Sequence, residues 1–378
     1  MICRATSSLP GRSASQTRVN ALMTRQSIDL RQELLAKGMD ARVKPAHDGV
    51  NMVRRRDFIF ALGAAAAWPL AARAQQPAMP VIGFMNAGSP EARAGVLAAF
   101  RQGLRETGYI EDQNVKIEYR WGENRYDRLP GMAAELVRRQ VAVIAATSTP
   151  AALAAKAATT TIPIIFETGG DPIRLGLVAS LNRPGGNITG VTQLNEEIAP
   201  KRLELLHELV PTASVIGLLV NPTDPALADT STRNLQAAAH ALGLQLHVLH
   251  ASTERDFDAV FANLSQLRAG GLVIGPDTFL VTRSERLAKL ALEHALPAVF
   301  EFREFVAAGG LMSYGGSTTD AYRMAGVYAA RILKGEKPSE LPVQQGTKIE
   351  LFLNLKTARA LGITVPLPLS GRADEVIE

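Results

Sequence analysis

An apolar run at 141–146 passes directly into Thr147-Ser148-Thr149-Pro150 and then into an alanine-rich stretch that reaches Ala158. This pattern predicts a buried strand that ends in hydroxyl residues and turns straight into a helix. Backbone N–H groups and partial positive charge collect at such a helix N-terminus, where an anionic ligand group can be held. The pattern is equally explained if Thr147 and Ser148 only cap the helix.

The same strand–turn–helix unit recurs along the chain. From Met79 onward, apolar runs of strand length alternate with helix-like stretches. The first series of these units ends with a helix expected from Pro172 through Leu181. A turn at 183–190 interrupts this series, and a second one follows, with strands expected at 215–220, 244–249, 272–275 and 297–300. Two consecutive series predict an α/β protein with two doubly wound parallel-sheet lobes.

Polar residues gather where the expected strands end. In an open parallel sheet, ligands bind at the carboxyl ends of the strands, so these residues are candidates for a binding cleft. Thr149, with nearby N–H groups, could hold a carboxylate, and Asp277 could receive an ammonium group, which together would suit a zwitterion. The aspartates could instead be helix caps. Trp121 and Tyr314 could add an aromatic wall or be structural. The candidates are Asn86, Ser89, Thr147, Ser148, Thr149, Asp171, Asn221, Asp277 and Glu301.

The sequence lacks the patterns typical of catalysis and of cofactor binding. The glycines at 83, 88 and 95 lack the spacing of a dinucleotide fingerprint, and there is no phosphate-binding loop of the Walker type. No serine lies in a Gly-x-Ser-x-Gly elbow, and the six histidines are scattered singly. We therefore expect no bond chemistry, no cofactor and no metal.

Basic charge is concentrated at the start of the chain. Residues 1–74 hold 12 of the 41 Lys and Arg residues but only 5 of the 36 acidic ones, so the remainder is slightly acidic and gives no argument for nucleic acid binding. Arg54-Arg55-Arg56 precedes a short apolar run and Ala72-Arg73-Ala74, a pattern that resembles a twin-arginine export signal. We expect cleavage after Ala74 and no stable membrane insertion afterwards. Residues 1–51 would then be a disordered extension from a misassigned start, with Met52 the natural initiator.

Four ordered segments carry a family resemblance. They are Ala-Thr-Ser-Thr-Pro-Ala at 146–151, Ile-Pro-Ile-Ile-Phe at 162–166, Gly-Asp-Pro at 170–172 and Arg-Pro-Gly-Gly-Asn-Ile-Thr-Gly at 183–190. Together they resemble the substrate-binding proteins of the tryptophan/tyrosine type of ABC transporter. The resemblance implies two Rossmann-like lobes joined by hinge strands, as in type I periplasmic binding proteins, that close on a small ligand in the periplasm. It also implies delivery of the ligand to an ABC permease in the inner membrane.

The resemblance also indicates which residues would form the cleft. It maps the cleft to Thr147, Ser148, Thr149, Asp171, Asn221 and Asp277, whereas Asn86, Ser89 and Glu301 follow from their positions at strand ends. Glu301-Phe302-Arg303 places charge where the aromatic-amino-acid binders carry smaller neutral residues, and the loop at 167–170 also differs from theirs. The ligand therefore remains open between an amino acid, aromatic or not, and a small carboxylate.

These observations lead to one main hypothesis. We expect a monomeric solute-binding protein with a first lobe at 75–192 plus 308–335, and a second lobe at 193–307 plus part of 336–378. An exported ligand-sensing module and an enzyme on the same two-lobed scaffold are the alternatives, because fold alone does not fix function.

Overall fold

The computed structural model describes residues 79–193 and 195–378. The predicted extension, export signal and cleavage point after Ala74 all lie outside these ranges. Among the residues described, every helix is too short or too polar to cross a membrane.

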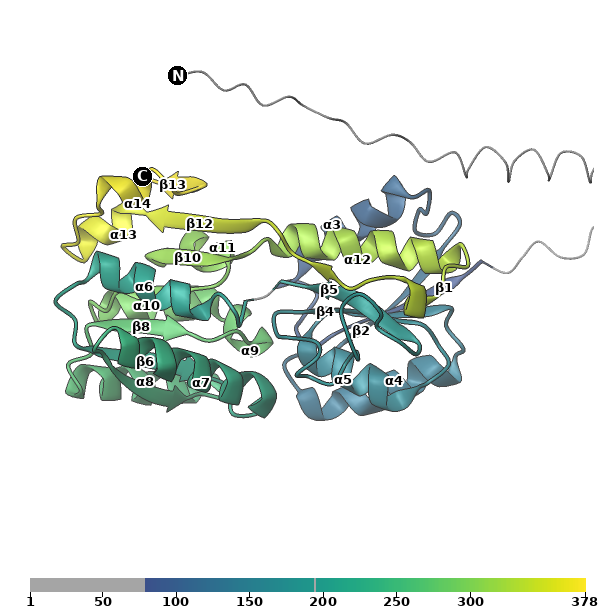
Figure 1. Ribbon diagram of the computed structural model, residues 1–378, viewed down its shortest axis with the longest axis horizontal. Helices are drawn as coiled ribbons and strands as arrows, with labels where there is room; N and C mark the ends of the chain where they lie inside the picture. Colours follow the sequence, from purple (N-terminus) through teal and green to yellow (C-terminus); the bar gives the residue numbers. More distant parts are fainter. Residues whose placement is uncertain (1–78, 194) are drawn as a thin grey trace, which may run out of the picture. The chain divides into compact units, whose positions relative to one another are not determined.

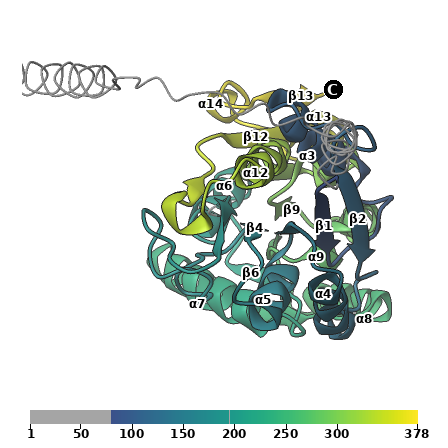
Figure 2. The ribbon, with the colours of Figure 1, turned by 90° about the vertical axis from the view of Figure 1, so that its right-hand side faces the viewer.

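Six parallel strands form the sheet of the first lobe (Figure 1), in the spatial order β11-β5-β4-β3-β1-β2. These strands are β1 (Val81–Asn86), β2 (Lys116–Trp121), β3 (Val143–Ala146), β4 (Ile164–Thr168), β5 (Ile188–Thr192) and β11 (Gln344–Gln345). The accompanying helices are α3 (Ala94–Glu106), η1 (Tyr126–Arg128), α4 (Leu129–Arg138), α5 (Thr149–Ala158), α12 (Thr318–Leu333) and η2 (Pro338–Glu340). Figure 2 shows α3 and α12 on one face of this sheet and α4 and α5 on the other.

The sheet of the second lobe has the order β13-β12-β10-β9-β8-β6-β7, with β12 antiparallel to β10 and the other pairs parallel. Its strands are β6 (Val215–Val220), β7 (Gln245–His250), β8 (Gly271–Ile274), β9 (Ala298–Phe300), β10 (Met312–Gly316), β12 (Ile349–Asn354) and β13 (Glu375–Ile377). Its helices are α6 (Ala199–Leu209), α7 (Pro225–Ala241), α8 (Glu254–Gln266), α9 (Thr278–Val281), α10 (Ser284–Glu293), α11 (Arg303–Ala307), α13 (Leu355–Ala360) and α14 (Leu367–Ser370). The prediction of two parallel α/β lobes is confirmed.

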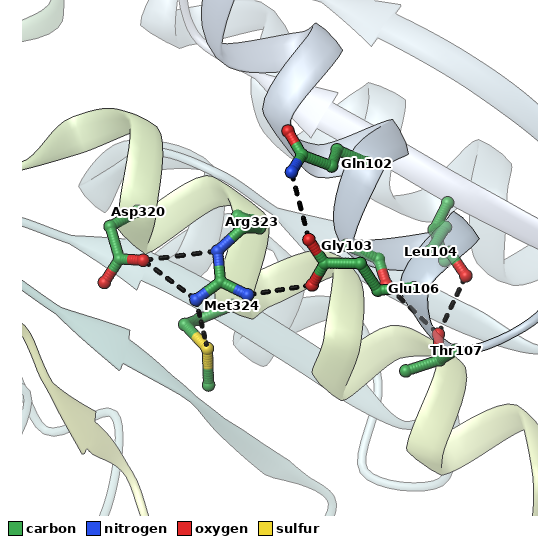
Figure 3. A network of polar contacts seen from close by, with 8 residues as sticks. All are labelled: Gln102, Gly103, Leu104, Glu106, Thr107, Asp320, Arg323 and Met324. Atoms are coloured by element: carbon green, nitrogen blue, oxygen red, sulfur yellow. Dashed lines mark hydrogen bonds and ion pairs between the residues drawn. The ribbon is translucent and has the colours of Figure 1, made fainter.

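Helices α3 and α12 pack closely because glycines lie where they cross. A Cβ atom on Gly103 would lie 1.9 Å from the carbonyl oxygen of Arg323, and one on Gly326 would lie 2.1 Å from that of Phe100. The contact ends in an ion pair, in which Arg323 of α12 reaches Glu106 of α3 at 2.8 Å (Figure 3). A helix from late in the sequence is thereby fixed to the first lobe.

Two details differ from the sequence-based expectations. The chain remains in the second sheet through β10, which pairs with β9 and β12, and only α12 returns to the first lobe. The boundary expected at 308 therefore lies after 316, because a short apolar strand does not reveal which sheet it joins. The helix expected from Pro172 through Leu181 is wrong, since this stretch consists of turns around Gly176 at a φ of 67°.

Candidate functional site

A cavity of about 40 Å³ lies between the two lobes and is lined by residues of both. The first lobe supplies the hydroxyl loop, Thr147-Ser148-Thr149, together with Arg93 and Glu167. The second lobe supplies Asp277, Glu301 and Phe302 at the ends of its strands. Because one buried water needs roughly 10–15 Å³ of such space, the cavity has room for only a few water molecules. A larger ligand requires the lobes to separate.

Asn86 at the end of β1 holds the hydroxyl loop from behind. It is fully buried, and its amide nitrogen donates to the Thr147 carbonyl, to Thr147 Oγ1 at 3.0 Å and to the Tyr322 hydroxyl at 3.0 Å. Its Oδ1 accepts from the N–H of Gly88 at 2.7 Å. Asn86 therefore positions the wall of the cavity and does not line it.

The hydroxyl loop leads into α5 without capping it. Ser148 occupies the N-cap position with extended backbone angles, and no side-chain capping bond to α5 occurs within the residues described. Ser148 Oγ instead accepts from the N–H of Ala87 at 3.2 Å, and Thr149 Oγ1 lies 2.6 Å from Thr168 Oγ1. The capping alternative for Thr147 and Ser148 is thus not the role their hydroxyls take here. The first N–H groups of α5 remain uncapped by a side chain beside the cavity.

Asp277 follows β8 and caps the short helix α9. Its Oδ1 accepts from the N–H of Leu280 and from Asn221 Nδ2, both at 3.1 Å, and its Oδ2 accepts from the Tyr126 hydroxyl at 2.8 Å. Burial raises the pKa of Asp277, and the hydrogen bond from Tyr126 offsets only part of this rise. The carboxylate already has three partners, so it has little capacity left for a ligand.

Tyr126, in η1 of the first lobe, bridges the two lobes. Besides donating to Asp277, its hydroxyl accepts from the N–H of Phe279 at 3.1 Å. A second bridge runs from Thr282 Oγ1 to Asn124 Oδ1 at 3.2 Å. We call these three hydrogen bonds the interlobe latch. Sequence reasoning missed it, because nothing in the local sequence around Tyr126 indicates a partner 151 positions away.

Buried charged groups complete the cavity. Burial raises the pKa of Glu301 to about 8, opposed by Arg202, and that of Glu167 to about 7, opposed by Arg93. Gln193 donates to Glu167 at 2.7 Å, whereas Glu301 Oε2 and Arg93 Nε have no hydrogen-bond partner in the described part of the chain. Arg93 and Glu167 were not among the predicted site residues.

Comparisons with known proteins identify the family. The model of the family described as ABC transporter substrate binding protein matches residues 80–377. The chain belongs to this family. A tyrosine-binding protein of Clostridioides difficile (strain R20291) is 29% identical over 262 residues, which span 69% of this chain and 75% of that protein.

Solved structures support the same assignment. A domain from Streptococcus pneumonia in complex with L-Trp is 26% identical with a TM-score of 0.73, covering 79% of this chain and 99% of that one. A conserved domain protein from Vibrio cholerae has 25% identity and the same TM-score and coverage. The tyrosine-binding protein and the domain in complex with L-Trp both bind an amino acid, which agrees with the expectation that this substrate-binding protein is not an enzyme.

The predicted site residues fall into three groups. Five line the cavity, namely Thr147, Ser148, Thr149, Asp277 and Glu301. Two lie behind it, namely Asn86 and Asn221. The remaining two, Ser89 and Asp171, do not line it. Ser89 accepts from the N–H of Ala92 at 3.4 Å, and Asp171 lines a separate cavity of about 170 Å³.

The proposed aromatic wall is also absent from this cavity. Trp121 packs against Phe84 with 5.4 Å between ring centroids, and Tyr314 packs against the core of the second lobe. Both take the structural role that the sequence left open. The aromatic rings that line the cavity are those of Phe302 and Tyr322.

Proposed function

We propose that this protein is the periplasmic solute-binding component of an ABC importer. It captures a small ligand that carries a carboxylate, with an amino acid as the leading class, and delivers it to a permease in the inner membrane. The observation that carries the proposal is the cavity between the lobes, to which each lobe contributes polar groups. The names of the relatives, a tyrosine-binding protein and a complex with L-Trp, support an amino acid.

Closure of the cleft follows from the way the chain crosses between the lobes. It crosses after β5, after β10 and after β11, and the first two crossings are tied together by Asn195, whose Oδ1 accepts from the N–H of Gly316 at 2.9 Å. Short crossings of this kind allow hinge motion of two rigid lobes. A ligand that contacts both lobes shifts the equilibrium towards the closed form by its differential affinity.

A thermal-shift screen of amino acids, aromatic acids and small carboxylates tests the proposal. A ligand at a hundred times its Kd stabilises the folded protein by about 2.7 kcal/mol, which is readily seen as a rise in Tm. We expect Thr149→Ala to weaken binding of the best compound by about 1 to 3 kcal/mol in calorimetry. If no compound raises the Tm, a role as an amino acid or carboxylate carrier is wrong.

Export and transport need a test in cells. We expect mass spectrometry of the periplasmic fraction to find a mature chain that begins at Gln75. In a second experiment, we expect the ligand-loaded protein to capture a permease from the membrane fraction. Capture of a chemoreceptor or kinase instead would favour the sensing alternative over transport.

A further inference from the structure

Two buried side chains of opposite charge lack hydrogen-bond partners and line the same cavity. Arg93 lies in the first lobe just before α3, is 7% exposed and has an Nε without a partner among the described residues. Glu301 lies in the second lobe after β9 and is 4% exposed, and its Oε2 also lacks a hydrogen-bond partner among the described residues. A buried polar atom without a hydrogen-bond partner destabilises the protein, so a ligand that satisfies both atoms gains affinity from them.

Neither group can satisfy the other in this structure. The charges of Arg93 and Glu301 attract each other, but no ion pair joins Arg93 to Glu301 or to Glu167 across the described residues. Both side chains line the cavity. The first lobe therefore presents a cationic donor, and the second lobe presents a carboxyl group that becomes an anionic acceptor once it loses its proton.

The charges around Glu301 leave room for one more cation. Arg202, behind Glu301, is fully buried and donates to the carbonyls of Asn195 and Tyr314 at 2.8 and 3.2 Å. Acidic groups also face Glu301, since the charges of Glu196 and Glu167 raise its pKa while Arg202 and Arg93 lower it. Three buried carboxyl groups thus share two guanidinium groups, so the third carboxyl group ionises fully only when a cationic nitrogen from a ligand compensates its charge.

Asp277 is the other acidic candidate, and its surroundings argue against it. Its two oxygens already accept three hydrogen bonds, one of them from the latch residue Tyr126. A ligand ammonium at Asp277 would have to displace a contact that holds the lobes together, whereas at Glu301 it would meet an unpartnered oxygen.

We propose that Glu301 receives the cationic nitrogen of the ligand and that Arg93 receives its anionic group, so that the substrate is a small zwitterion held between the two lobes. This assignment rests on the proposed binding function and makes Glu301 and Arg93 its specificity determinants. It also predicts that binding is coupled to a proton. Glu301, with a pKa of about 8, is largely protonated at pH 7 when no ligand is bound. Binding of the ammonium group favours the ionised carboxylate, so Glu301 releases its proton to solvent.

The test uses the expected mature chain, from Gln75 to Glu378, and the twenty standard amino acids as probes. For the tightest of them, calorimetry compares the amino acid with its deaminated acid and its decarboxylated amine, which for L-tyrosine are 3-(4-hydroxyphenyl)propionate and tyramine. We expect Glu301→Gln to weaken the amino acid by about 10- to 100-fold and the deaminated acid by less than about 3-fold. Arg93→Met should weaken the deaminated acid and the amino acid but leave the amine nearly unchanged.

Proton release provides a readout that a merely structural role of Glu301 would not change. Titrations at pH 7 in phosphate and in Tris, which differ in ionisation enthalpy, should give close to one proton released per ligand in the wild-type protein and almost none in Glu301→Gln. The matched control is Glu293→Gln, the same substitution at an exposed position near the end of α10. Should Glu301→Gln fail to fold, the wild-type proton count decides alone.

The outcomes separate the two proposals. If no amino acid binds, the proposed function and this assignment both fail. If an amino acid binds without proton release, or binds Glu301→Gln and Arg93→Met with unchanged affinity, the proposed function stands and this assignment is wrong.

Discussion

Asn86 and Asn221 occupy equivalent positions in the two lobes. Asn86 is the last residue of β1 and Asn221 directly follows β6, each of these strands lies next to the edge strand of its sheet, and both side chains are buried. The Oδ1 of each accepts from an N–H two residues ahead, at 2.7 Å from Gly88 and at 3.0 Å from Thr223. The Nδ2 of each donates to the loop after the neighbouring strand, β3 or β8. One local device thus fixes the wall of the cleft in both lobes.

The two asparagines differ in what they hold. Asn86 holds the hydroxyl loop at the start of α5, which presents N–H and O–H donors, whereas Asn221 holds the carboxylate of Asp277. At these two strand ends the first lobe therefore presents donors and the second lobe presents a carboxylate, while Glu167 adds an acidic side chain to the wall of the first lobe. Equivalent strand ends can thus carry opposite polarity, which suits a ligand with two unlike ends.

A pH titration of unfolding should show the largest effect, because the second lobe contains buried carboxyl groups. The pKa is raised by burial to about 7 in Asp224 and to about 8 in Glu301. The folded state therefore binds more protons than the unfolded state between about pH 4 and pH 8, so its stability falls across this interval and levels off above the folded-state pKa values. We expect a loss on the order of 3 kcal/mol for the ligand-free protein between pH 5 and 8, measured by urea unfolding.

The origin of that loss can be checked with Glu301→Gln, which removes the strongest of these titrations. The variant should depend less steeply on pH than the wild-type protein. A stability that rises between pH 5 and 8 in the wild-type protein would contradict the raised pKa values of Asp224 and Glu301.

Replacement of Asn86 by alanine should have the next largest effect. It removes four hydrogen-bond contacts and leaves the N–H of Gly88 and oxygens around Thr147 buried without this partner. We expect a loss of about 2–4 kcal/mol in the free energy of unfolding. Urea denaturation monitored by circular dichroism measures it, and a loss below about 1 kcal/mol would show that the hydroxyl loop is held by other contacts.

The equivalent substitution, Asn221→Ala, should cost less, about 1–2 kcal/mol. It removes contacts to Asp277 and Thr223, but Asp277 keeps its bonds from Leu280 and Tyr126. The same denaturation experiment ranks the two asparagines directly. Equal losses at both positions would refute the difference between the two walls.

Tyr126→Phe should have the smallest effect, since it removes only the hydroxyl of the interlobe latch. The closed form would lose about 1 kcal/mol, which corresponds to roughly a fivefold weaker apparent affinity for a ligand that binds on closure. Calorimetry measures it against the control Tyr109→Phe, a residue of the first lobe that packs on its core. An unchanged affinity would mean that the latch does not contribute to closure.

The sequence was informative where structure is local. Buried parallel strands are short apolar runs, so 141–146 and 215–220 could be recognised within two residues of β3 and β6. The hydroxyl loop could be placed at the cavity because strand ends of a parallel sheet converge on one edge. Family membership could be inferred from the order of four motifs.

The rest of the site depends on contacts between distant segments. Arg93 is one basic residue among many until packing buries it, and Tyr126 becomes notable only beside Asp277. Ser89 and Asp171 satisfied the same local rule as the cavity residues, but their loops turn away into local hydrogen bonds. Sequence reasoning can locate a strand end, but it cannot decide which side chain reaches the space between two lobes.

The glycine contact between α3 and α12 has a practical consequence for dividing this protein into fragments. Residues 79–192 contain five strands of the first sheet but lack α12 and β11, which come after the whole of the second lobe. A fragment ending at 192 would expose the apolar surface around Phe100 that Tyr322 and Ala325 cover in the intact chain. Expression of the lobes as separate pieces therefore requires a permuted gene in which 318–345 is joined to the first lobe.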